Sequence, residues 1–123
     1  MSPQGRERTI FENVPSCVGH SVSLWEGIWL KKITQKHPDM VGREKDVEET
    51  IKNPSEVHEN YCEGRTNVLY WGSYTNRPPR EKYLKVATCI RDQAKKESIV
   101  LTAHVSPFIS DARMHGGKKI WPT

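Results

Sequence analysis

The sequence is poor in cysteine, and its three cysteines, Cys17, Cys62 and Cys89, form no C-x-x-C pair. Without such spacing it has neither the pattern of a disulfide scaffold nor that of a zinc site, and a reducing compartment is the simplest expectation. It also lacks any apolar run near the roughly 20 residues that cross a bilayer. Residues 1–8 lack the apolar core of a secretory signal. These absences predict a cytoplasmic protein with no membrane partner.

Apolar side chains are also scarce. They make up 35% of the 123 residues, against 28% charged residues, so one domain with a thin core is expected. Lys and Arg number 19 against 15 Asp and Glu, which gives a net charge of +4. Such an excess is compatible with a polyanion partner, but many proteins with other functions share it.

A first helix is predicted from Ser23 to about His37. Ser23 with Glu26 three residues later matches a capping box, and Pro38 ends the helix because it disfavours helical geometry at the preceding residue. His37 also continues the apolar stripe of this helix, whose members recur at i, i+4 and i+8. These stripe residues are Trp25, Trp29 and Ile33.

A second helix is predicted over residues 43–52, where Val47 and Ile51 form an i, i+4 apolar pair and Asn53-Pro54 stops it. The period then changes from about 3.6 to 2, which is typical of strands. Short linkers favour antiparallel pairing of these strands. Four are predicted, over residues 56–61, 67–75, 82–91 and 98–105.

The alternation in the last two strands predicts which side chains share a face. Ile99, Leu101, Ala103 and Val105 are expected to face the helices, as are Leu84, Val86 and Ile90. The opposite face would then bring Lys85, Thr102 and His104 together. We therefore expect α+β architecture, with two N-terminal helices packed on a four-stranded antiparallel sheet. Residues 1–22 would be an N-terminal extension, and residues 23–123 the single domain.

Several motifs occur in a characteristic order. A Trp is followed eight residues later by His37-Pro38, then come Thr50-Ile51-Lys52-Asn53-Pro54 and Lys82-Tyr83-Leu84-Lys85-Val86, and then Leu101-Thr102-Ala103-His104. With the final Lys-Ile-Trp-Pro, this order resembles the phage and bacterial nuclease-like domains of the barnase–EndoU–colicin–RelE superfamily. The resemblance covers roughly residues 23–122. It implies an RNA-cleaving site on the face of the sheet, usually independent of metal and without a cofactor.

The resemblance matches His37 to the histidine at the helix end and Thr102 to the threonine of the strand motif. His104 stands where many relatives carry an aromatic residue, and no strand glutamate of the barnase kind is matched. In this hypothesis His37 and His104 transfer protons, Lys85 stabilises negative charge, and Thr102 orients the phosphate. The alternatives are structural: His37 can interact with the helix C-terminus, and Thr102 is an ordinary strand residue.

RNA is the expected partner, and a neutralising or host protein is a further candidate. Aromatic rings beside cations can stack unpaired bases and hold phosphates, although such rings are also common in sheets. The candidate RNA-binding residues are Arg65, Tyr70, Arg77, Arg80, Lys82 and Tyr83. Two functions therefore remain open. One is a metal-independent endoribonuclease, and the other is a catalytically inactive module, such as a phage inhibitor or structural protein, that binds RNA or protein.

Overall fold

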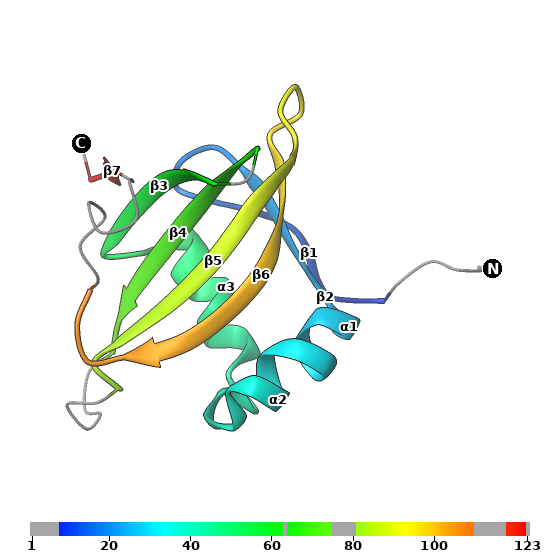
Figure 1. The fold of residues 1–123 in the computed structure, drawn as a ribbon, viewed down its shortest axis with the longest axis vertical. Helices are drawn as coiled ribbons and strands as arrows, with labels where there is room; N and C mark the ends of the chain where they lie inside the picture. The colour runs from blue at the N-terminus through cyan, green and yellow to red at the C-terminus, as the bar shows by residue number, and fades with distance from the viewer. Residues whose placement is uncertain (1–7, 63, 75–80, 110–117, 123) are drawn as a thin grey trace.

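The computed structural model describes residues 8–62, 64–74, 81–109 and 118–122 (Figure 1). In these residues the main element is a seven-stranded sheet with the order β1-β2-β6-β5-β4-β3-β7. The strands are β1 (Thr9–Pro15), β2 (Ser21–Trp25), β3 (Glu56–Cys62), β4 (Arg65–Ser73), β5 (Tyr83–Asp92), β6 (Glu97–Ser106) and β7 (Lys118–Trp121). The helical segments are α1 (Glu26–Ile28), the π-helix η1 (Trp29–Ile33), α2 (Thr34–Lys36), the 3₁₀ turn η2 (Pro38–Met40) and α3 (Glu44–Lys52).

The expected fold class, two helices on a four-stranded antiparallel sheet, is wrong. The four predicted strands do exist as β3 to β6 and pair antiparallel in sequence order. However, β1 and β2 extend the sheet beyond β6, and β7 extends it beyond β3. Because β2 pairs with β6 in parallel, the sheet is mixed.

The first helix was predicted to begin at Ser23, but Ser23 lies in β2 and does not cap a helix. Its hydroxyl accepts a hydrogen bond from the backbone N–H of Asn13 at 3.0 Å. Val22 and Leu24, on either side, are fully buried, and the helix begins only at Glu26, without a side-chain cap. Burial of two large apolar side chains stabilises by several kcal/mol, which outweighs the roughly 1 kcal/mol of a capping interaction.

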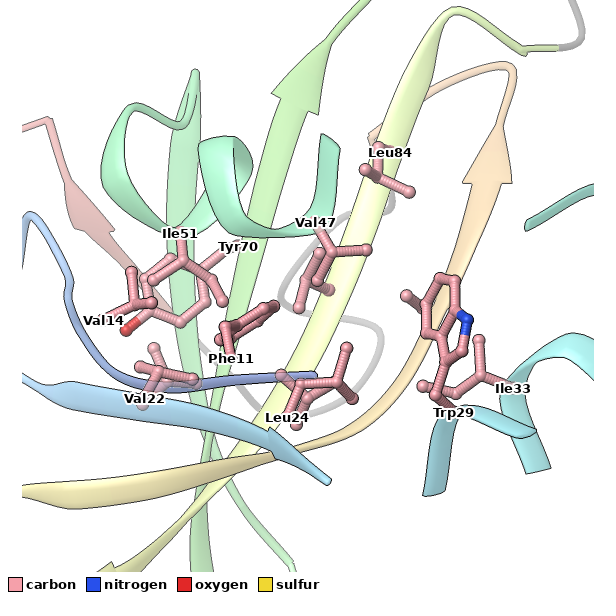
Figure 2. Close-up of a cluster of buried hydrophobic side chains, with 14 of the residues drawn as sticks. Phe11, Val14, Val22, Leu24, Trp29, Ile33, Val47, Ile51, Tyr70 and Leu84 are labelled. Carbon is pink, nitrogen blue, oxygen red and sulfur yellow. The ribbon is translucent and has the colours of Figure 1, made fainter. Parts of the chain in front are cut away.

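The segment expected to be an N-terminal extension supplies β1 and the first part of β2. Phe11 and Val14 of β1 are buried in the same core as the rest of the sheet (Figure 2). Residues 9–22 thus belong structurally to the domain that follows them.

The helices pack mainly on one face of the sheet. The predicted helix over residues 43–52 is confirmed as α3, and its Val47 and Ile51 are fully buried (Figure 2). In the first helical segment Trp29 and Ile33 are buried as predicted, whereas Trp25 lies in β2. Figure 1 shows α3 behind β4 and β5, so the opposite face of these strands is turned toward the viewer.

A β-bulge in β6 changes which side chains face the core. Ala87 of β5 lies opposite Thr102, but the next residue of β5 lies opposite Val100, so Leu101 is the extra residue. Val100 is therefore fully buried in the core. The expectation that Ile99 and Leu101 face the helices is wrong, because one additional residue reverses the alternation. Beyond the bulge, the predicted core residues Ala103 and Val105 do pack in the core.

Candidate functional site: a histidine pair beside a lysine

His37 and His104 come from different elements and meet at one end of β6. The backbone N–H of His37 donates to the carbonyl of Ile33 at 2.7 Å, and Pro38 then stops the helix. β2 pairs with β6 only over residues 97–99, so the first helical segment can lie beside the rest of β6 (Figure 1). The two imidazole rings stack with their centroids 5.1 Å apart and their planes inclined at 28°.

Lys85 is the third basic group of this cluster. It lies directly opposite His104 in the antiparallel pair of β5 and β6, so both side chains point to the same face. On its other side Lys85 lies opposite Trp71 of β4, and its Nζ is 5.4 Å from the centre of that indole ring. Trp71 is 1% exposed, so the ammonium group rests on a buried aromatic surface, which favours a cation.

Burial and like charge disfavour the protonated forms within this cluster. Burial lowers the pKa of His104, and the nearby positive charges of Lys85 and His37 lower it further, while Asp39 acts in the opposite direction. Burial also lowers the pKa of the Lys85 ammonium. At neutral pH His104 is therefore mainly neutral and able to accept a proton.

Thr102 lies on the same face, two residues before His104 and opposite Ala87. Together with Lys85 it lines a hollow of about 210 Å³. Within the described residues, none of the ion pairs involves Lys85, His37 or His104. A cluster of basic groups without such an ion pair attracts an anion. We name His37, Lys85, Thr102 and His104 the basic cluster.

The candidate RNA-binding residues do not all join the basic cluster. Tyr83 is half-buried on the same face, two residues from Lys85, and its ring lies 5.7 Å from Nζ of the exposed Lys82. Arg65 is exposed at the start of β4. In the antiparallel pair the end of β4 faces the start of β5, so Arg65 is at the opposite end of the sheet from Tyr83.

Tyr70 cannot contact RNA in this fold. It lies on the core face of β4, is fully buried, and points into the cluster that contains Val14 and Ile51 (Figure 2). Burial raises the pKa of its hydroxyl to about 12. Its assignment to RNA binding is therefore a wrong prediction: alternation along β4 turns Trp71, and not Tyr70, toward the face of the basic cluster. The other two candidates, Arg77 and Arg80, lie outside the described residues.

The sequence did not reveal a hydrogen bond between His58 and Glu56 on this face. His58 lies in β3 and is only 5% exposed. Its Nε2 lies 2.9 Å from Oε1 of Glu56, and its ring is 6.4 Å from that of Trp71. Only the pairing of β3 with β4 places His58 there, because Glu56 lies opposite Trp71 in that register.

Groups of three or more His, Cys, Asp or Glu side chains that could hold a metal ion do not occur among the described residues. In the same part of the chain, every helix is too short or too polar to cross a bilayer. The basic cluster offers imidazole, ammonium and hydroxyl groups for chemistry.

Comparison with known proteins adds no relative. No protein-family model matches the sequence, and no curated protein or solved structure matches it. The resemblance to nuclease-like domains therefore stays a prediction.

Proposed function

We propose that this protein is a small metal-independent endoribonuclease that acts in the cytoplasm. The single observation that carries the proposal is the stacking of His37 on His104, 5.1 Å apart, next to Lys85. Two imidazoles beside a cation are the groups that cleavage through a ribose 2′-hydroxyl needs. One must remove a proton, another must supply one, and the cation must neutralise charge on the phosphate.

The lowered pKa of His104 makes it the base. Its neutral imidazole takes the proton of the 2′-hydroxyl while the 2′-oxygen forms a bond to phosphorus. The bond from phosphorus to the 5′-oxygen then breaks, and protonated His37 gives its proton to that oxygen. The products are a 2′,3′-cyclic phosphate and a 5′-hydroxyl, so this step consumes no water.

Lys85 and Thr102 act on the phosphate in this scheme. The Lys85 ammonium pairs with a non-bridging oxygen, whose negative charge grows in the transition state. The Thr102 hydroxyl donates a hydrogen bond that orients the same group. Burial of Lys85 strengthens its interaction with the phosphate because solvent screening is weaker there.

The test uses pure protein and mixed-sequence RNA in EDTA, with His37→Gln and His104→Gln as variants. Glutamine keeps hydrogen-bonding capacity but cannot exchange protons at neutral pH. We expect each variant to cleave about 10²–10⁴-fold more slowly than the wild type. The matched control is His20→Gln, because His20 is bound to Ser98 by a 3.2 Å hydrogen bond and is not part of the basic cluster. That variant should cleave normally.

The two functions give different results in this assay. Cleavage that persists in both cluster variants contradicts the proposed chemistry. RNA that is retarded in a gel but not cut identifies a catalytically inactive binding module. In the described residues none of the basic-cluster groups is ion-paired with a carboxylate, which is compatible with that second function. A protein with no effect on RNA would point to a role in protein contacts.

A further inference from the structure

The hollow beside the basic cluster has two chemically different ends. It holds about 210 Å³, less than the roughly 300–1,000 Å³ of sites for drug-sized ligands, and so suits a fragment. Lys85 lies at one end. Asn67 lies at the other, opposite Cys89 of β5 and so four residues along from Lys85, about 13 Å at strand spacing. The complete lining is Asn60, Asn67, Leu69, Lys85, Ala87, Leu101 and Thr102.

The asparagine end carries two unsatisfied acceptors. Asn60 and Asn67 are directly opposite each other in β3 and β4. The Oδ1 atom of each is buried without a hydrogen-bond partner in the described part of the protein. Buried polar atoms nearly always have a partner, because leaving one unmade costs about 1–3 kcal/mol. Both residues line the hollow, and turning their amides toward it would let these two acceptors receive hydrogen bonds from a ligand.

We propose that this hollow is a base-binding subsite in which Asn60 and Asn67 recognise adenine. The inference rests on the proposed function and names the nucleotide that the same site prefers. An asparagine amide can form two hydrogen bonds with adenine, accepting from its exocyclic amine and donating to a ring nitrogen. The exocyclic amine of adenine has two N–H donors, one for each amide oxygen, whereas uracil attached to ribose has a single N–H donor and can satisfy only one of them.

The rest of the hollow fits the remainder of a nucleotide. Leu69, Ala87 and Leu101 supply apolar surface for the faces of a flat base. Lys85 lies at the far end, where a phosphate attached to that base would meet the basic cluster. The span between the two ends, about 13 Å, has the scale of one nucleotide with the side chains that hold it.

The test measures binding of adenosine and uridine monophosphates to the full chain by calorimetry. The variants are Asn60→Leu and Asn67→Leu, which keep the side-chain shape but remove the amide. We expect the wild type to bind the adenine nucleotide about tenfold more tightly, and each variant to bind both nucleotides equally. The matched control is Tyr61→Leu, since Tyr61 follows Asn60 in β3, is exposed, and points to the other face. It should keep the preference.

Thermal melting separates recognition from a structural role. If the amides serve a ligand, removing the orphan acceptors leaves the melting temperature of the free protein unchanged or raises it. A clear drop in both leucine variants would show that the amides support the fold and would contradict the inference. The inference also fails if either variant keeps the adenine preference, or if the wild type binds both nucleotides equally or not at all.

Failure of this inference differs from failure of the proposed function. Metal-free cleavage that depends on His37 and His104 but shows no base preference overturns the subsite alone. Adenine-selective binding without any cleavage supports the subsite and overturns the endoribonuclease.

Discussion

The rings of His37 and His104 stack with centroids 5.1 Å apart, although one residue ends a helix and the other lies in the last long strand. Because His104 is partly buried and lies opposite Lys85, protonating its ring costs more than it would in solvent. The pKa of His104 is therefore lower than that of an ordinary histidine. It leads to predictions that can be checked without knowing the biological substrate.

Replacing Lys85 with methionine should raise the pKa of His104. The variant removes the largest nearby positive charge, but burial remains the first cause of the lowered value, so the pKa should stay below 6.5. An NMR titration of the imidazole protons measures this shift. Lys82→Met is the control, because Lys82 is exposed over Tyr83. Equal titration curves for wild type and Lys85→Met would contradict the geometry.

An anion bound at the basic cluster should act in the opposite direction. Inorganic phosphate places negative charge beside the imidazole and favours its protonated form, so the pKa of His104 should rise when chloride is replaced by phosphate at equal ionic strength. In Lys85→Met the rise should be smaller because the anion loses its ammonium partner. The same NMR titration reads out both effects. If phosphate leaves the pKa of His104 unchanged in the wild type, this anion site is ruled out.

The pH dependence of stability should also report on His104. Its pKa is lowered from 6.5 in the folded state, so between the folded and unfolded values the unfolded chain binds more protons. Lowering the pH through that window therefore favours unfolding, and stability is regained above about pH 6.5. His104→Gln should lose less free energy of unfolding between about pH 7.5 and 5.5 than the wild type. Urea denaturation at both values measures the difference.

His20 contributes to the same pH dependence of stability. Burial and the charge of Lys96 lower its pKa too, so it contributes a change of the same sign. It is present in both proteins, and the difference between them isolates His104. Parallel losses of stability in wild type and variant would show that His104 titrates normally in the folded state.

Gly72 should be intolerant of a side chain. A Cβ added there would lie 2.6 Å from Oγ1 of Thr50 in α3, and Thr50 is held by a 2.8 Å hydrogen bond to the carbonyl of Asp46. Gly72→Ala should therefore cost about 1–3 kcal/mol of stability through overpacking. Adding Thr50→Ala should recover much of that cost, which a double-mutant cycle of urea denaturation measures. Strictly additive effects would place α3 further from β4.

Local pattern predicted the elements that depend on neighbours along the chain. The period of Val47 and Ile51 predicted α3, and Pro38 predicted the helix end that positions His37. Alternation predicted the four strands β3 to β6. Each of these depends on contacts within a few residues, where backbone sterics and side-chain periodicity are decisive.

Pairing between distant segments decided the rest, and local pattern has no access to it. The local sequence around Ser23 resembles a helix cap. However, β1 and β6 pair with β2 on both sides, so Ser23 lies in a strand. The bulge at Leu101 reverses a face that simple alternation assigns wrongly, and Tyr70 enters the core because of the side of β4 on which α3 packs.

The sequence alone determined which groups this protein has for chemistry: the imidazoles of His37 and His104, the ammonium of Lys85 and the hydroxyl of Thr102. Only the tertiary structure decided that His37 stacks on His104. It also decided that two asparagine oxygens have no partner among the described residues and belong to residues that line the same hollow as Lys85. The physical reason is that residue type and period are local properties. The distance between two side chains on different strands depends instead on the register of the whole sheet.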